Sequence, residues 1–475
     1  MVDKTREIAL KILYKIDVED AYSNIVLDEM INKNRNLLNK RDIGLISEIV
    51  YGVTTWRLTL DEIIKKYSNL RLKKISPWIL NILRMGIYQI VFLDKIPKSA
   101  AVNESVNLAK RYGHKSSSNF VNAILRKVDK TDYEEFFDIK DDIERISKTN
   151  SMPVWLIEEL LNQREIENKE GKIKDEKINT EDEKINVVHE ESIKQVEEIC
   201  KNSNIRPKIS IRVNKLKIDK NELKNELKEQ NINVTDGVID DFLILEQTKN
   251  IENLDLFKKG FFTIQDEAAG LVPLILNANS NENVLDACSA PGGKTTYIAE
   301  IMKNQGNIEA WDIYEHRVNL VNRNANRLGI SIINTNVKDA TKLKEEYLMK
   351  FDKILLDVPC LGLGVLKRKP DIKWKRNKEQ IQEIKKIQEE ILQNCSKYLK
   401  NGGELVYSTC SILKSENEEV INEFLNKNTN FSIEKINLRK YKYFEKFLKN
   451  EKLLQVYQNE LTDGFFICKL KKKCN

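Results

Sequence analysis

Two cysteines of this chain occupy positions at which a thiol could do chemistry. Cys360 follows an apolar run and the turn Asp-Val-Pro, and Cys410 follows the run Tyr-Ser-Thr. Both runs have the pattern of a buried strand, and in an open α/β sheet the carboxyl ends of the strands face the ligand crevice. A single cysteine at a strand end is most often a packed small hydrophobe. Two cysteines at such ends favour a pair of reactive thiols.

A glycine-containing turn at residues 283–296 could hold a ligand beside those thiols. Its sequence, NVLDACSAPGGKTT, indicates a buried strand that ends in Asp286, then a tight turn and a helix start. A phosphate-binding P-loop is disfavoured because Cys288 stands where that motif has its first glycine. A dinucleotide fingerprint is disfavoured because only Gly292 and Gly293 of its glycines are present. A strand–helix turn that binds nothing stays open as an alternative.

The third ligand, S-adenosylmethionine, fits the residues that follow. Its ribose hydroxyls need an acid at the end of the next strand, as the ribose of a dinucleotide does. Residues 308–312 have a short strand pattern that ends in Asp312 at a suitable distance downstream. We therefore expect this methyl donor to bind here, with Cys288 as a loop residue beside it.

A methyl donor next to thiols indicates a target that must be activated covalently. Carbon 5 of a pyrimidine is such a target, because it is too weak a nucleophile to attack a sulfonium methyl group. A thiolate that adds to carbon 6 raises the electron density at carbon 5, and a base later removes the carbon 5 proton while the thiol is eliminated. The attacking cysteine needs a lowered pKa. A second thiol can assist elimination, and the target must leave its base stack.

The composition places these residues in a large protein of the cytoplasm. The 475 residues suggest two to four domains. No window of about 18 apolar residues exists, and the charged start of the chain lacks the apolar core of a signal peptide, so no membrane span is expected. The seven scattered cysteines, without C-x-x-C spacing, argue against a disulfide framework and a metal site. The net charge of +6 permits nucleic-acid binding without demonstrating it.

Four segments are expected along the chain. Residues 1–145 show only helical periodicity and predict a small all-α domain. Residues 146–189 predict a helix plus a charged flexible insertion; residues 165–186 have almost no large apolar side chains, and a conditional helix is the alternative. Residues 190–260 alternate helix and strand as a small α/β subdomain. Residues 261–475 alternate strands and helices, which indicates a Rossmann-like, doubly wound parallel sheet.

Periodicity also gives the expected elements of the last two segments. The predicted strands are residues 209–214, 242–245, 308–312, 330–334, 351–356, 403–408 and 464–469. A helix is predicted at residues 220–230, and a longer one, charged on one face and apolar on the other, at residues 378–399.

The first segment resembles a known RNA-binding fold. The likeness is carried by Tyr51-Gly52, residues 82–86, Ile96-Pro97, residues 101–104 and residues 120–126. They look like the NusB-type RNA-binding helical domain, in the version that is fused to a ribosomal RNA methyltransferase. The resemblance implies a role in docking RNA, whereas the short basic clusters of this segment are by themselves typical of solvated faces.

The last segment resembles the RNA cytosine-carbon-5 methyltransferases. The motifs that carry the likeness are LDACSAPGGKTT at residues 285–296, DVPC at residues 357–360 and YSTCS at residues 407–411. Arg212 and Asn214 match a segment that precedes the catalytic domain of this family. With the N-terminal segment, the chain is similar to the Sun/Fmu type, which modifies a cytosine of small-subunit ribosomal RNA. The resemblance implies a class I methyltransferase fold and S-adenosylmethionine as cofactor, and we expect a monomer without a metal ion.

The resemblance also implies a role for each site residue. Cys410 maps to the nucleophile and Cys360 to the thiol that assists product release, although the DNA cytosine methyltransferases use the cysteine of their P-C motif as nucleophile. The implied donor-binding residues are Cys288, Ser289, Ala290, Pro291, Gly292, Gly293, Lys294, Asp312, Asp339 and Asp357. Asp312 would bind the ribose and Asp339 the adenine edge. Asp357 would lie near the methionine part or contact the target base.

One departure from the family and two rival functions accompany this assignment. The family usually has small polar residues after the P-C cysteine, where this chain has LGLG at residues 361–364. Residues 367–371 form a basic loop suited to phosphate contacts, or else a solvated surface loop. The rivals are a cytosine methyltransferase that acts on transfer RNA or large-subunit RNA, and a non-enzymatic RNA-binding factor. The intact acids and cysteines of the site disfavour the second rival.

Overall fold

The chain divides into two compact units. The computed structural model describes residues 3–172, 181–246 and 251–474. The helical unit comprises Met1–Asn204 and Leu366–Lys378, and the sheet unit comprises Ile205–Val365 and Glu379–Asn475. The chain thus leaves the sheet unit after Val365, joins the helical unit, and returns at Glu379. Residues 366–378 form this excursion, whereas the sequence predicts them as part of the last segment, residues 261–475.

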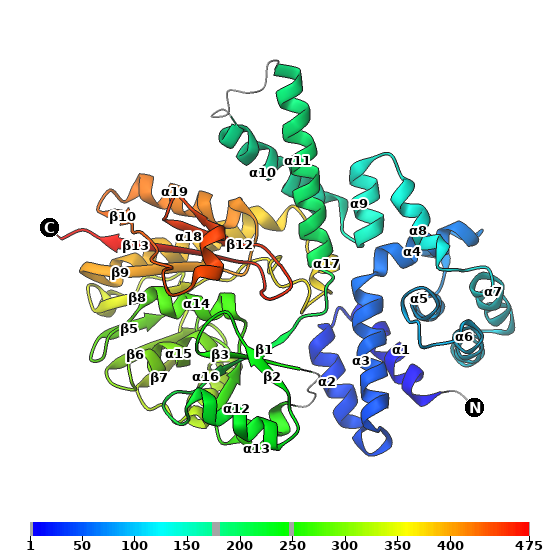
Figure 1. Cartoon of the computed structure of the whole chain (residues 1–475), viewed down its shortest axis with the longest axis horizontal. Helices are drawn as coiled ribbons and strands as arrows, with labels where there is room; N and C mark the ends of the chain where they lie inside the picture. Colours follow the sequence, from blue (N-terminus) through cyan, green and yellow to red (C-terminus); the bar gives the residue numbers. More distant parts are fainter. Residues whose placement is uncertain (1–2, 173–180, 247–250, 475) are drawn as a thin grey trace. The chain divides into compact units, whose positions relative to one another are not determined.

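The helical unit is built from α-helices that polar side chains cap. Its helices are α1 (Lys4–Val18), α2 (Ser23–Lys33), α3 (Lys40–Thr55), α4 (Arg57–Tyr67), α5 (Pro77–Phe92), α6 (Lys98–Tyr112), α7 (Lys115–Leu125), α8 (Thr131–Glu134), α9 (Asp142–Asn150), α10 (Val154–Lys172), α11 (Glu181–Asn202) and α17 (Ile372–Lys375) (Figure 1). Asp3 caps α1, and Asn39 and Asp42 form a capping box at the start of α3. Residues 3–145 contain helices and no strand, so the predicted all-α fold is confirmed.

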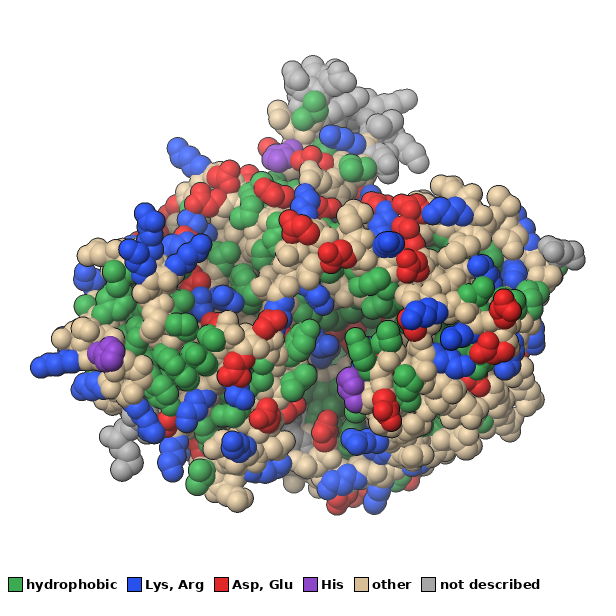
Figure 2. Space-filling model, turned by 180° about the vertical axis from the view of Figure 1, so that it is seen from behind, with side chains coloured by type: hydrophobic (Ala, Val, Ile, Leu, Met, Phe, Trp, Pro, Cys, Tyr) green, Lys and Arg blue, Asp and Glu red, His purple; other side chains and the backbone are tan. Residues whose placement is uncertain are grey.

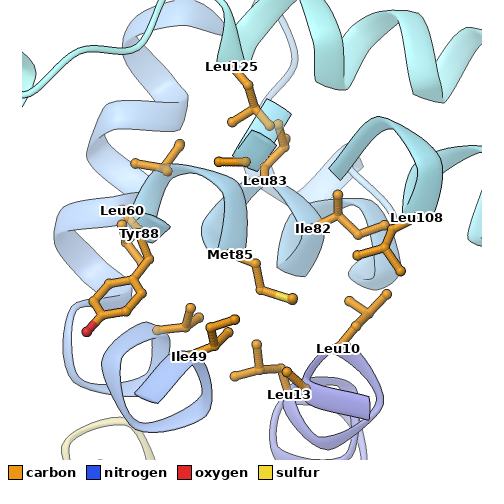
Figure 3. Packing of buried hydrophobic residues seen from close by; sticks show 14 of the residues in the cluster. Leu10, Leu13, Ile49, Leu60, Ile82, Leu83, Met85, Tyr88, Leu108 and Leu125 are labelled. Carbon is orange, nitrogen blue, oxygen red and sulfur yellow. The ribbon is translucent and has the colours of Figure 1, made fainter. Parts of the chain in front are cut away.

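Helix α5 lies at the centre of the core of this unit. Almost all of its side chains from Ile79 to Val91 are buried. Figure 3 shows Ile82, Leu83 and Met85 surrounded by apolar side chains of neighbouring helices. A helix that is apolar on every side is stable only when other helices cover it. Its one buried cation, Arg84, is neutralised by ion pairs with Asp17 and Asp61.

Helices α10 and α11 correct the prediction of a flexible insertion. Helix α10 extends to Lys172 and α11 begins at Glu181, so residues 165–172 and 181–186 are helical. The predicted residues between them lie outside the described part of the chain. The lack of large apolar side chains favoured a flexible segment over the alternative of a helix, but Glu and Lys are good helix formers even where few apolar side chains are present. Apolar residues elsewhere in both helices, such as Leu160 and Val196, are buried and anchor them.

The sheet unit begins with a small antiparallel sheet. Its strands β1 (Ile209–Val213), β2 (Val234–Asp236), β3 (Phe242–Leu245) and β4 (Phe262–Ile264) lie in the order β2-β3-β1-β4. Two helices accompany them, α12 (Lys220–Glu229) and α13 (Asp255–Lys258). The predicted strands at residues 209–214 and 242–245 and the helix at residues 220–230 are confirmed to within one residue.

The larger sheet has a parallel centre and an antiparallel edge. Its strands are β5 (Asn283–Asp286), β6 (Asn307–Asp312), β7 (Ile333–Val337), β8 (Phe351–Asp357), β9 (Leu399–Thr409), β10 (Phe431–Ile433), β11 (Leu448–Lys449), β12 (Leu453–Val456) and β13 (Phe465–Lys472). The order is β11-β12-β13-β9-β8-β5-β6-β7, with β10 on β13. The five strands from β9 to β7 are parallel, and β13 is antiparallel to β9. The predicted strands that correspond to β6, β8, β9 and β13 are confirmed.

Helices cover both faces of this sheet. They are α14 (Glu267–Leu276), α15 (Gly293–Ile301), α16 (Glu315–Leu328), α18 (Gln380–Cys395) and α19 (Glu418–Lys427). Alternate residues of the strands belong to different cores: Val284 packs in the cluster with α14 and α15, and Leu285 packs in the cluster with α18 and α19. The predicted doubly wound sheet is confirmed, but the prediction that it is parallel holds only for the five strands from β9 to β7, because β13 and its neighbours pair antiparallel.

One predicted strand, residues 330–334, begins three residues too early. Gly329 ends α16 in the left-handed region, with a φ of 75°. The backbone N–H of Ile330 then donates to the carbonyl of Ala325, and the Ile330 side chain is buried at the end of the helix. Ladder pairing with β6 starts at Ile333. The apolar pattern was correct, but its first residues cap the helix.

The surface is mixed in charge. On the face drawn in Figure 2, lysines and arginines are interspersed with acidic side chains, in keeping with a net charge of +6. Among the described residues, none of the helices has both the length and the hydropathy needed to cross a bilayer.

Candidate active site

The register of the main sheet brings the predicted acids to one edge. Asp286 ends β5, Asp312 ends β6 and Asp357 ends β8, while Asp339 follows β7 by two residues. β5 pairs in parallel with both β6 and β8, so these strands end at the same edge. In a doubly wound sheet this carboxyl edge is where ligands bind.

The two predicted cysteines lie at the same edge and touch each other. Asp357 pairs with Ser408, which places the ends of β8 and β9 side by side. The sulfur atoms of Cys360 and Cys410 are 3.1 Å apart, and both residues are half-buried. The hydrogen bond to Cys410 and burial together raise the pKa of Cys360 well above its usual range. Cys360 therefore keeps its proton and can donate it in a hydrogen bond to the Cys410 sulfur.

The turn at residues 288–294 is held rigidly against β6. The backbone N–H and the hydroxyl of Ser289 both donate to the carbonyl of Trp311, at 2.8 and 2.9 Å. The half-buried residues Cys288 and Ala290 flank Ser289, and Pro291 is exposed. Asn324 donates to the carbonyl of Pro291 at 2.9 Å. The turn thus has a fixed backbone that a ligand can approach from the open side.

Two glycines leave room at this turn for different reasons. Gly292 has a φ of 100°, and a Cβ there would lie 3.1 Å from the Cα of Val321, so the protein itself requires glycine. At Gly293 a Cβ would meet only Gln265, at 3.7 Å or more. The protein does not require glycine at that position, whereas close approach of a ligand would. Gly293 begins helix α15, whose N-terminus favours an anionic group.

Asp286 is the most buried acid of the edge. It is 1% exposed, its Oδ2 accepts the hydroxyl of Thr295 at 2.7 Å, and its Oδ1 has no hydrogen-bond partner in the part of the chain that the structure describes. Burial raises its pKa to about 7. The carboxyl group is thus enclosed by the protein, and its bond to Thr295 fixes the start of α15 against the end of β5.

Asp312 and Asp339 present carboxylates at the ends of β6 and β7. Asp312 is buried, accepts the backbone N–H of Tyr314 at 3.2 Å, and lies 3.4 Å from a guanidinium nitrogen of Arg317. Asp339 accepts the hydroxyl and the N–H of Thr341, and the hydroxyl bond is the main cause that holds its pKa below the usual range. Both are anchored ionic acceptors, as recognition of a nucleoside requires.

Lys294 links the turn to the cysteine end of β8. Its ammonium lies 2.6 Å from the Asp357 carboxylate, which also accepts the hydroxyl of Ser408 at 3.0 Å. Burial acts to lower the pKa of Lys294, but Asp357 outweighs it and the pKa is raised; the Cys410 sulfur acts in the same direction. The ammonium therefore keeps its proton and stays paired with Asp357.

Arg212 supports the turn from the small sheet, a role that the sequence left unassigned. Its guanidinium is fully buried, donates to the carbonyl of Gly293 at 2.8 Å, and pairs with Glu300 at 2.7 Å. It also donates to the hydroxyl of Thr296 at 3.1 Å. The match of Arg212 to a family segment was the only sequence signal, since its partners lie more than 50 positions away in the chain.

The predicted basic loop at residues 367–371 is mostly buried. Only Lys369 of this loop is exposed, whereas Lys367 and Asp371 are buried. The hydroxyl of Ser23 in α2 donates to Asp371, and Trp374 donates to the carbonyl of Thr54 at 2.6 Å. The prediction of a loop made of phosphate-binding cations is therefore wrong for most of its residues, because the segment packs inside the helical unit.

Three family models match successive parts of the chain. Residues 3–130 match the NusB family. Residues 187–252 match the ferredoxin-like domain of RsmF/B-like methyltransferases. Residues 273–471 match 16S rRNA methyltransferase RsmB/F. The matches follow the all-α part, the small sheet and the main sheet in that order.

Individual proteins are similar over the same length. The "Probable ribosomal RNA small subunit methyltransferase B" of Bacillus subtilis (strain 168) is 36% identical over 473 residues, which covers 98% of each chain. The crystal structure of PH0851 is 25% identical with a TM-score of 0.76, covering 99% of this chain and 100% of that one. A methyltransferase homolog protein from Pyrococcus horikoshii is 28% identical with a TM-score of 0.50, covering 58% of this chain and 90% of that one.

Proposed function

Since the chain belongs to the RsmB/F family of 16S rRNA methyltransferases, we propose that it methylates carbon 5 of a cytosine in small-subunit ribosomal RNA. The methyl donor is S-adenosylmethionine. The observation that carries the proposal is the contact between the sulfurs of Cys360 and Cys410. The turn at residues 288–294 reaches the same sheet edge, where Lys294 pairs with Asp357. Methylation of a more nucleophilic atom would not need a thiol pair at this place.

The residues of the edge suit this donor. S-adenosylmethionine, when bound, supplies an electrophilic methyl group. The carboxylate of Asp312 would accept the ribose hydroxyls, and Asp339 would contact the adenine edge. The turn at residues 288–294, where a Cβ on Gly293 would come no closer than 3.7 Å to Gln265, would lie against the methionine part.

Cys410 would act as the nucleophile. Its thiolate adds to carbon 6 of the cytosine, and the electron pair of the 5,6 double bond makes carbon 5 the acceptor of the methyl group. The ammonium of Lys294, paired with Asp357 at the end of β8, lies at the same edge of the sheet as this cysteine. The target base would first leave its stack to reach the sulfur.

Cys360 would assist the release of the product. After carbon 5 loses its proton, the electrons reform the double bond and the Cys410 sulfur leaves as a thiolate. A protonated Cys360 at 3.1 Å can donate a hydrogen bond to that leaving sulfur. The raised pKa of Cys360 supports this role and disfavours Cys360 as the attacking group.

The test is methylation of isolated small-subunit RNA by the purified full-length protein, read by bisulfite sequencing. We expect one protected cytosine, no protection with Cys410→Ser, and a slow-migrating covalent protein–RNA species on denaturing gels with Cys360→Ser. Transfer RNA and large-subunit RNA are assayed in parallel. Methylation of those RNAs instead would overturn the substrate, and substantial activity of Cys410→Ser would overturn the nucleophile. Absence of both donor binding and methylation would favour a non-enzymatic RNA-binding factor.

A further inference from the structure

A buried carboxylate, Glu416, lies between the two turns that carry the cysteines. Its side chain is fully buried, and it comes from the short helical turn that follows β9. Its Oε2 accepts the backbone N–H of Leu361, the residue after Cys360, at 2.9 Å. Its Oε1 accepts the hydroxyl of Ser411, the residue after Cys410. One carboxylate therefore bonds to the next residue of each cysteine.

A second side chain extends the same connection. Gln388 of α18 is also fully buried and donates to Glu416 at 3.1 Å and to the carbonyl of Pro359 at 2.9 Å. Pro359 is the residue before Cys360. The Cys360 turn is thus held on both sides of its cysteine, and both bonds lead to the same carboxylate.

The backbone closes the connection from the other side. The N–H of Gly364 donates to the carbonyl of Cys410 at 2.8 Å, and the carbonyl of Gly364 accepts the N–H of Gly464 at 2.7 Å. A Cβ on Gly364 would lie 2.2 Å from the carbonyl oxygen of Gly464. The LGLG stretch, unusual for the family, therefore serves close backbone packing beside Cys410.

We propose that Glu416 is a positioning residue that holds the Cys360 and Cys410 turns together, so that the two sulfurs stay in contact during catalysis. The inference rests on the proposed function for its kinetic consequence, but not for its geometry. Without the carboxylate, the N–H of Leu361 and the hydroxyl of Ser411 lose a common acceptor in a buried place, where an unmade bond is costly. Backbone bonds such as that from Gly364 to the Cys410 carbonyl would remain, but the link through the Glu416 side chain would be lost and the two sulfurs would be held less closely.

The exchange of Glu416 for glutamine or alanine separates hydrogen bonding from charge. Both substitutions remove the negative charge. Glutamine keeps one oxygen, which can accept from Leu361 and Gln388, and an amide that can donate to the Ser411 hydroxyl. Alanine removes every bond. A positioning role therefore predicts that Glu416→Gln resembles the natural protein and that Glu416→Ala does not.

Disulfide closure measures the position of the sulfurs without reference to catalysis. The azo oxidant diamide takes two electrons and two protons from two thiols, giving a disulfide and a hydrazine. Closure between Cys360 and Cys410 is followed by mass spectrometry of the linked peptides in the full-length protein. We expect closure in the natural protein and in Glu416→Gln at rates within about threefold of each other, and at least about tenfold slower closure in Glu416→Ala, because the effective concentration of the two thiols falls. Equal rates in all three proteins would overturn the proposal.

The matched control is Glu267→Ala. Glu267 is another fully buried carboxylate of the sheet unit and accepts the N–H of Ile239 at 2.7 Å, a contact that does not involve a cysteine turn. We expect its closure rate to be unchanged; a slowing equal to that of Glu416→Ala would show general loosening and overturn the proposal. If Glu416→Ala does not fold, Ser411→Ala removes the hydrogen bond between Ser411 and Glu416 while the bond from Leu361 remains. An unchanged rate of disulfide closure in that variant would also overturn the proposal.

Kinetics supply the second readout. With an active preparation, Glu416→Ala is expected to lower kcat by about 10²-fold, as a misplacement of about 1 Å can do, while the KM for S-adenosylmethionine changes less than twofold. Glu416→Gln should restore most of kcat. A loss that appears in KM instead overturns the positioning role. If the natural protein forms the disulfide but methylates no RNA, the proposed function is wrong, while the positioning role of Glu416 is still supported.

Discussion

Lys294 is half-buried and Lys373 is fully buried, and their pKa values shift in opposite directions. Lys294, in the sheet unit, pairs with Asp357 at 2.6 Å, and its pKa is raised although burial acts against it. Lys373, in the excursion that joins the helical unit, is 1% exposed, and burial lowers its pKa to about 7. Lys373 donates to the carbonyls of Thr55 and Ser151 and to the side chain of Asn204. Neutral acceptors satisfy its hydrogen bonds but do not balance its charge.

The difference separates a structural lysine from one suited to chemistry. Carbonyl acceptors hold the Lys373 ammonium in place, and the protein can release its proton near neutral pH. The carboxylate of Asp357 keeps Lys294 charged at the sheet edge that also carries Cys410, where we propose that a thiolate forms. Two lysines that are largely removed from solvent can thus serve opposite purposes, and their partners decide which.

Removal of the Lys294 charge should have the largest effect on turnover. We expect Lys294→Met to lower kcat by about 10²-fold or more, the loss typical for a charge that stabilises a reacting group in a dry site. The same substitution should slow alkylation of Cys410 by iodoacetamide at pH 7, measured by peptide mass spectrometry. Lys373→Met is the matched control, because it removes a buried lysine outside the site. Similar losses of kcat in both variants, after correction for the folded fraction, would break the comparison.

Lys373 should instead appear in the pH dependence of stability. The unfolded chain keeps the Lys373 proton up to about pH 10.5, whereas the folded protein releases it near pH 7. Between these values unfolding takes up a proton, so this group makes the protein more stable as the pH rises; below about pH 7 its contribution is constant. Relative to Lys373→Met, the natural protein should gain roughly 1 kcal/mol of unfolding free energy for each pH unit above 7.

Urea denaturation of both proteins at pH 7, 8 and 9 measures this gain. Groups other than Lys373 titrate in both proteins and cancel in the difference. A difference that does not change with pH would mean that Lys373 keeps its proton in the folded state. The contrast with Lys294 would then lie in position alone, and not in charge.

The surroundings of the two lysines also show which features can be predicted from the sequence and which cannot. Strands that end in Asp312, Asp357 and Cys410 could be predicted, because alternation and turn residues are local signals. The burial of Lys373 could not, since it depends on Thr55, 318 positions away in the chain. Read locally, residues 367–371 are a basic surface loop. Only the tertiary structure shows that they join the helical unit.

The supporting residues of the site could not be predicted for the same reason, because their partners lie far away in the chain. Arg212 carries a family likeness, but its bond to Gly293 spans 81 positions. Glu416 gave no local signal at all, because a charged residue just after a strand is typical of a solvated turn. The acids and cysteines of the edge were found because each ends a strand or follows one within three residues. The side chains that hold them in place come from elements that the sheet brings together only after folding.

Arg212 should affect donor binding more than chemistry. Its planar guanidinium bonds to Gly293, Thr296 and Glu300 at once, which an ammonium cannot reproduce. We expect Arg212→Lys to weaken binding of S-adenosylmethionine by about tenfold, or roughly 1.4 kcal/mol, in isothermal titration calorimetry, with a smaller change in kcat. The control is Arg327→Lys, because Arg327 donates to the carbonyls of Phe257 and Phe262 rather than to the turn. Equal weakening by both substitutions would assign Arg212 to stability only.

The smallest effect is expected at Lys369, the exposed lysine of the otherwise buried loop at residues 367–371. If the loop contacts a phosphate, Lys369→Ala removes about one released counterion, so the slope of log Kd against log salt should fall by about one unit. Fluorescence anisotropy with a labelled fragment of small-subunit RNA at several salt concentrations measures that slope. Lys367→Met is the partner variant, since a buried lysine should change stability and leave the slope unchanged. An unchanged slope in Lys369→Ala would leave the loop without a role in RNA binding, and Lys294 would then be distinguished from every lysine of the excursion by its contact with the site.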